Sequence, residues 1–177
     1  MPPIMLQAII RLMVLIQDPA TADGLRSTAP VYLTPEQAAE HSAAAAYAAR
    51  QYQLDDTLLL SIAYHESRYT DAVTPEPGGK YSCGTMTPVP QAHCSRQAPV
   101  EGYLAGAAHL RGWITAERGD LRLALLGYAG GGRLIRACAD GPVLTHGVDA
   151  CHTPAVFLAR AAWIRTERRR ARARVSS

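Results

Sequence analysis

The spacing of apolar residues predicts that the chain is organised around one helix over residues 58–69. Leu59, Ile62, Ala63 and Glu66 occur at i, i+3, i+4 and i+7, so they share one face of that helix. A glutamate at the end of an apolar face is unusual, because glutamates are seldom buried without a partner. Partial burial and a nearby helix C-terminus would both raise its pKa. Glu66 is therefore a candidate general acid, and the alternative is an ordinary solvated glutamate.

Similar patterns elsewhere predict a mainly α fold with little or no β-sheet. Residues 34–37 have the order of an N-cap, a first-turn proline and the glutamine of a capping box. Asp55 or Asp56 is expected to cap the next helix, and glycines 130–132 are expected to interrupt a later one. The predicted helices are residues 4–17, 35–52, 58–69, 99–119, 121–128, 134–138 and the segment that begins at Thr153.

The composition fits one folded domain. The chain has 177 residues, of which 48% are hydrophobic and 19% are charged, which argues against global disorder. We expect a helix and linker in residues 1–31, the main domain in residues 32–159, and a basic helix end in residues 160–177. The apolar residues 1–16 are too short and too interrupted to span a membrane, and they lack the features of a signal peptide. A degenerate export signal or a membrane-surface helix is the alternative to a helix packed on the core.

Two features concern the loops. Residues 70–98 form a long segment rich in proline and glycine, and loops of this length are usually functional or mobile. Four cysteines also fall in loop regions, and the simplest of their three pairings is Cys83 with Cys94 and Cys138 with Cys151. Disulfides would place the protein outside the cytoplasm. Four free thiols are one alternative. A metal site is another, although the tight cysteine pairs of zinc sites are missing.

The net charge of +3 conceals a strongly basic end. Seven arginines lie from Arg160 to Arg174, with Glu167 as the one acid among them. This segment is interpreted as a solvated helix end with weak attraction to anionic wall polymers or membrane. Nucleic-acid binding is not expected, because no aromatic residue follows Trp163 to provide a stacking surface.

Three segments together resemble a known family. Glu66–Tyr69 resembles the E-S-x-F/Y motif of SLT-type lytic transglycosylases, which have a goose-type-lysozyme-like domain. Gly84–Pro90 resembles their G-L-M-Q-x-x-P segment, and Leu123–Gly131 resembles their A-L-A-x-Y-N-x-G segment. Gly106 also takes the glycine position of their N-x-x-x-G-x-x-Y-L helix. The resemblance covers about residues 54–132, in the same order and with similar gaps.

The resemblance implies a helical, lysozyme-like domain with a groove that binds the glycan strands of peptidoglycan. Glu66 would cleave the bond between N-acetylmuramic acid and N-acetylglucosamine, acting first as acid and then as base, and would leave a 1,6-anhydromuramoyl end. No cofactor, metal or second carboxylate is implied, and a monomer is expected. A hydrolytic muramidase is the nearest alternative, with Asp71 or Glu76 as its second carboxylate. A non-catalytic wall-binding protein is the other.

The resemblance also implies a set of substrate-binding residues, which are Ser67, Gly84, Met86, Thr87, Tyr128 and Gly130. Tyr128 would donate a hydrogen bond to Glu66 or to the substrate, and Met86 would line the groove. Both residues have an alternative role in the core. The chain departs from the family at Thr85, Thr87, Gly102 and Ala129, where the family has leucine, glutamine, asparagine and asparagine. The implied location is extracytoplasmic: periplasm, cell envelope, secreted, or carried by a phage or secretion machine.

Overall fold

The structure is a computed structural model, and it describes residues 33–69, 73–76, 80–83, 85–86, 99–145 and 147–175. The helix predicted over residues 4–17 and the linker after it lie outside this part of the chain. No described helix has the length and apolar character that crossing a membrane requires.

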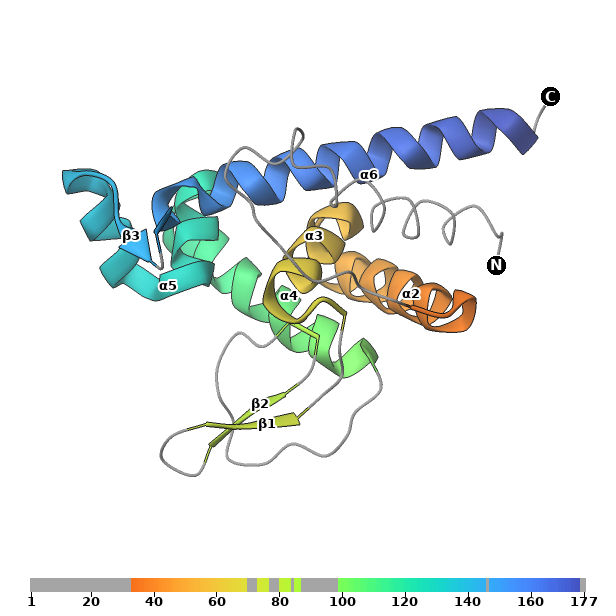
Figure 1. Cartoon of the computed structure of the whole chain (residues 1–177), viewed down its shortest axis with the longest axis horizontal. Helices are drawn as coiled ribbons and strands as arrows, with labels where there is room; N and C mark the ends of the chain where they lie inside the picture. The colour runs from red at the N-terminus through yellow and green to blue at the C-terminus, as the bar shows by residue number, and fades with distance from the viewer. Residues whose placement is uncertain are drawn as a thin grey trace.

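The described residues confirm a mainly α fold. The helices are α2 (Pro35–Tyr52), α3 (Asp56–Ser67), α4 (Pro99–Ala116), α5 (Leu121–Asp140) and α6 (Thr153–Val175), with a short 3₁₀ helix η1 (Ala150–His152). The strands form two small antiparallel hairpins, β1 (Val73–Glu76) with β2 (Lys80–Cys83), and β3 (Leu144–Thr145) with β4 (Val148–Asp149). Figure 1 shows the β1–β2 hairpin on one side of the helices and α6 running along the opposite side.

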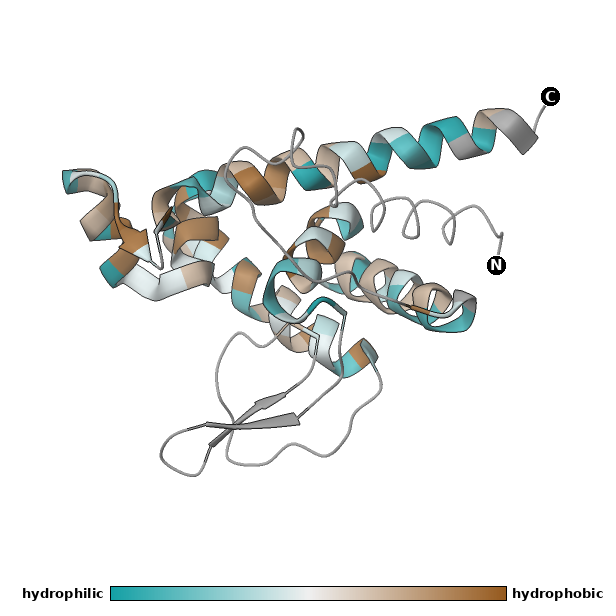
Figure 2. Cartoon of the chain, viewed as in Figure 1, coloured by the Kyte–Doolittle hydropathy of each residue, from teal (hydrophilic) through white to brown (hydrophobic). Residues whose placement is uncertain are grey.

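Helix α3 is the centre of the core, because every residue from Thr57 to Tyr64 is buried. It packs against α2 and α6, while α4 packs against α2 and α5. A helix that is buried on all sides in this way must be apolar around its whole circumference, which is what its sequence provides. Figure 2 shows hydrophobic residues along α3 and the first half of α6, and hydrophilic residues along the second half of α6.

The helix boundaries follow from local chemistry. Thr34 accepts a hydrogen bond from the backbone of Gln37, whose side chain in turn accepts one from the backbone N–H of Thr34, so the predicted capping box is present. Asp55 is the cap of α3. The helix predicted to reach residue 69 ends at Ser67, because Arg68 adopts a left-handed φ of 53° and Tyr69 one of 62°.

Helix α5 is bent. The sequence predicts separate helices over residues 121–128 and 134–138, and α5 has two helical parts separated by non-helical backbone at Gly130 and Gly131, as predicted. Gly131 has a φ of +67°, a conformation that glycine adopts without steric cost. Beyond the kink, a disulfide between Cys138 and Cys151 joins the end of α5 to η1. This confirms one predicted pair, while Cys94 of the other lies outside the described residues.

The arginines at the start of the basic segment are not a solvated end. Arg160 is buried, donates to the carbonyl oxygen of Ser61 and lies 4.6 Å from the ring centre of Tyr64. Arg168 donates to both carboxylate oxygens of Asp56 at 2.8 and 2.9 Å. Helix α6 therefore remains in contact with the core beyond residue 160.

Two further ion pairs extend this arrangement. Arg165 pairs with Asp55, so the two acids that precede α3 or begin it are both bound to α6. Glu167 is buried and pairs with Arg170 at 2.7 Å. The N-terminal end of α3 is therefore held to α6 by ion pairs. The two carboxylates also interact favourably with the positive end of the α3 dipole.

Candidate active site

Glu66 lies in the last turn of α3, one residue before the helix ends. Its side chain reaches solvent, yet desolvation by the surrounding protein raises its pKa from the ordinary 4.5 to about 7. A carboxyl group can be both exposed and desolvated when protein atoms surround it on most sides and leave one side open, where a substrate can reach it. Burial therefore favours the protonated form of Glu66 near neutral pH far more than in an ordinary solvated glutamate.

Two hydrogen bonds hold the segment Thr85–Met86 beside this helix end. The hydroxyl of Ser67 donates to the carbonyl oxygen of Thr85 at 2.7 Å and is also 3.1 Å from that of Ala63. The hydroxyl of Tyr128 donates to the carbonyl oxygen of Met86 at 2.6 Å. Successive carbonyl groups are thus bound by α3 and α5, so these two helices fix the segment relative to Glu66.

Met86 is a core residue and does not line a groove, which differs from the role implied by the resemblance. Its side chain is fully buried and lies against Gly106 of α4. A Cβ atom at position 106 would be 2.6 Å from the Cβ of Met86, which is closer than real contacts allow. The glycine is therefore required by the close approach of the segment to α4.

Tyr128 holds the segment through its hydrogen bond to Met86, where a bond to Glu66 or to substrate was expected. A phenol has a single proton to donate, so this bond occupies it. Tyr128 nevertheless lies within electrostatic reach of Glu66, because its pKa is raised by burial and by the charge of that carboxylate. The geometry makes Tyr128 a positioning residue.

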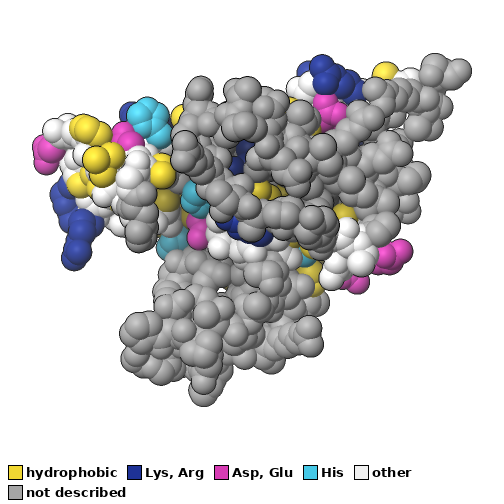
Figure 3. Space-filling view, viewed as in Figure 1, with side chains coloured by type: hydrophobic (Ala, Val, Ile, Leu, Met, Phe, Trp, Pro, Cys, Tyr) yellow, Lys and Arg dark blue, Asp and Glu magenta, His cyan; other side chains and the backbone are white. Residues whose placement is uncertain are grey.

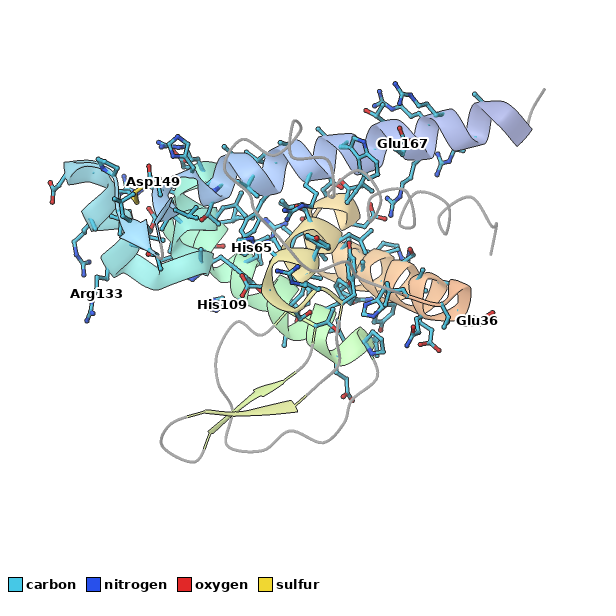
Figure 4. The ribbon with its side chains drawn as sticks, in the orientation of Figure 1. Glu36, His65, His109, Arg133, Asp149 and Glu167 are labelled. Atoms are coloured by element: carbon cyan, nitrogen blue, oxygen red, sulfur yellow. A yellow bond between two sulfur atoms is a disulfide. The ribbon has the colours of Figure 1, made fainter. Side chains whose placement is uncertain are left out.

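Two histidines belong to the elements that form this site: His65 is the neighbour of Glu66 in α3, and His109 contacts Tyr128. His65 precedes Glu66, its ring is 5.0 Å from that of Phe157, and burial together with the charges of Arg160 and Arg68 lowers its pKa to about 4. His109 of α4 has its ring 5.3 Å from that of Tyr128. Figure 3 shows acidic and histidine side chains gathered near the centre of one face, and Figure 4 labels His65 and His109 in the same part of the molecule.

Sequence reasoning did not single out His109 or its neighbour Trp113. The indole N–H of Trp113 donates to Nε2 of His109 at 3.1 Å, one helical turn away. Burial lowers the pKa of His109, which favours its neutral form. The i, i+4 spacing of the two residues was the available signal.

The remaining expected residues are only partly placed. Gly130 is exposed at the kink of α5, and a Cβ there would contact Leu134. Gly84, Thr87 and Asp71 lie outside the described residues. Within the described ranges, no three metal-ligating side chains are grouped closely enough to hold an ion.

Comparison of the chain with protein-family models, curated proteins and solved structures gives no match.

The hydrogen bond from Tyr128 to Met86 predicts a measurable stability difference. Tyr128→Phe would leave a buried carbonyl oxygen without its donor, at a cost of about 1–2 kcal/mol in the free energy of unfolding. The matched control is Tyr47→Phe, since Tyr47 is an exposed tyrosine of α2 and should change stability little. Urea denaturation of both variants measures the difference, and equal unfolding free energies would contradict the positioning role.

Proposed function

We propose that this chain is a peptidoglycan lytic transglycosylase in which Glu66 is the acid and the base. The observation that carries the proposal is the Glu66 carboxyl group, which is accessible at a helix end while desolvation raises its pKa to about 7. The family resemblance of the motifs around Glu66, Met86 and Tyr128 supports it, because the fold brings these three segments to one place.

The reaction needs a carboxyl group that can serve in both protonation states. Protonated Glu66 gives its proton to the glycosidic oxygen as the bond from that oxygen to C1 of the muramoyl sugar breaks. The resulting carboxylate then removes the proton of the 6-hydroxyl, whose oxygen attacks C1 and closes the 1,6-anhydro ring. Glu66 ends the cycle protonated. A pKa near the working pH suits a group that must both give and take a proton.

A single carboxylate is sufficient for this route, because the nucleophile belongs to the substrate. Most glycosidases place two carboxylates on either side of the bond, one of them to activate water or to attack. Among the residues with described side chains, Glu66 is the acid at the helix end where Ser67 binds the carbonyl oxygen of Thr85. The proposal takes the intramolecular reaction over hydrolysis because the family resemblance implies it.

The proposed substrate places the protein outside the cytoplasm, and the disulfide between Cys138 and Cys151 fits such an oxidising location. The periplasm, the cell envelope, secretion, or transport by a phage or a secretion machine are the proposed settings. Peptidoglycan glycan strands are the proposed partner, with the exposed part of the basic helix end adding weak attraction to anionic polymers.

Mass spectrometry of digested peptidoglycan tests the proposal. We expect muropeptides with a 1,6-anhydromuramoyl end, one water lighter than the corresponding reducing products. Reducing ends would instead identify a hydrolytic muramidase. Binding to peptidoglycan with no released products would show a wall-binding protein that does not cleave.

A further inference from the structure

The protonation state of His109 is fixed by its neighbour on α4. The indole N–H of Trp113 points at Nε2 of His109 across 3.1 Å. An indole nitrogen donates and does not accept, so Nε2 must be unprotonated. An imidazole whose Nε2 accepts is neutral and carries its one proton on Nδ1, and burial favours this neutral form. His109 is thus held as a neutral donor at Nδ1.

The position of Trp113 is fixed in turn by Gly127 of α5. A Cβ atom at Gly127 would be 2.3 Å from Cε3 of Trp113, so the indole lies directly on the backbone of α5. The ring of His109 also contacts that of Tyr128, one residue further along α5, at 5.3 Å between centres. Two contacts with α5 therefore fix the orientation of the pair.

Tyr128 connects the donor with the candidate acid. The charge of Glu66 acts on Tyr128, whose ring touches that of His109. His109 is half-buried, so part of its ring reaches solvent. In the part of the chain that the structure describes, its polar contact is the one with Trp113 at Nε2, and Nδ1 has no acceptor.

We propose that His109 binds the substrate by donating its Nδ1–H to a sugar oxygen beside the bond that Glu66 cleaves, with Trp113 as the positioning residue. The acetamido carbonyl oxygen is the strongest neutral acceptor on an N-acetylated hexosamine, and it is the assigned partner. This inference rests on the proposed function.

A neutral donor is suited to this place. A lysine or arginine beside Glu66 would favour the carboxylate and lower its pKa, so the acid would lose its proton at neutral pH. A histidine held neutral by an indole N–H supplies a hydrogen bond without that charge. The tautomer therefore lets the site bind a polar substrate and keep its acid protonated.

Two amide variants distinguish the loss of the Nδ1–H donor of His109 from the loss of its ring. In His109→Asn, an amide N–H can occupy the place of Nδ1, whereas His109→Gln places its amide near Nε2, toward Trp113. We expect His109→Gln to lower the rate of 1,6-anhydromuramoyl product formation at limiting peptidoglycan about tenfold, and His109→Asn to remain within about threefold of wild type. Trp113→Phe, which frees the tautomer, should lie between them. Thermal unfolding of the three variants checks that each is folded.

Equal rates in His109→Gln and wild type, or equal losses in both amide variants, would overturn the inference while leaving the Glu66 assignment intact. If the wild type releases no products, the proposed function fails. The role of His109 is then decided by binding of N-acetylglucosamine tetramer, which nuclear magnetic resonance of the imidazole nitrogens detects. Binding that His109→Gln loses and His109→Asn keeps supports the donor. No binding, or no difference between the variants, overturns it.

Discussion

Replacing Glu66 with glutamine is expected to reduce peptidoglycan cleavage roughly a thousandfold, the middle of the range for general acid–base catalysis. The amide has nearly the same shape as the carboxyl group but cannot give or take the proton. Release of soluble muropeptides measures the effect. Cleavage by Glu66→Gln at the wild-type rate would remove Glu66 from the mechanism.

The same variant should be more stable than wild type at alkaline pH. The folded state raises the pKa of Glu66 from 4.5 to about 7, so ionisation is easier in the unfolded chain. Stability is therefore lost as the pH rises from about 4.5 to 7. Glutamine removes this loss, and we expect a gain of about 1 kcal/mol at pH 8, reduced by the solvent exposure of the side chain, with little change at pH 4.

Glu36→Gln is the matched control for this pH dependence. Glu36 lies in the first turn of α2, where backbone and Thr34 hydrogen bonds lower its pKa. Its carboxylate favours the helix, so its replacement should lower stability at pH 8 and leave cleavage unchanged. Thermal unfolding at pH 4 and pH 8 compares the two variants, and a shift of the same sign in both would contradict the argument.

A second large effect is expected at Gly106. Gly106→Ala would place a methyl group 2.6 Å from the Cβ of Met86, an atom that cannot move without its backbone. We expect a loss of about 2 kcal/mol in the free energy of unfolding, as for other overpacked cores. Because the same segment is bound by Ser67 and Tyr128, cleavage should fall as well.

Helix α4 offers its own control. Gly112 is exposed on that helix, and a methyl group there would meet no atom within 4 Å, so Gly112→Ala should stabilise the helix by up to about 1 kcal/mol. Chemical denaturation of both alanine variants tests the contrast. A Gly106→Ala protein as stable as Gly112→Ala would mean that Met86 does not depend on the missing side chain.

The parts of this structure that sequence predicted are those with local causes. The capping box of α2, the aspartate cap of α3, and the buried face that leads to Glu66 each depend on residues within one or two turns. The interruption of α5 was predicted from its glycines, because glycine adopts the positive φ of Gly131 without steric cost.

The site itself depends on contacts that sequence does not encode locally. The bonds from Ser67 to Thr85 and from Tyr128 to Met86 end on backbone carbonyl oxygens, which every residue has, so no residue type announces the partner. The pKa of Glu66 likewise depends on how closely distant segments surround it. The i, i+4 spacing of His109 and Trp113 could have predicted their hydrogen bond. The contact of His109 with Tyr128, which links the pair to the site, could not be predicted from the sequence.

The ion pairs of α6 decide where the chain can be shortened without losing its fold. A cut before Arg160 would remove Ile164 from the core and leave Asp55 and Asp56 without their cations. A cut after Arg170 keeps all of these contacts. That shorter protein is the form in which loss of affinity for an anionic polymer can be attributed to the missing arginines and not to unfolding.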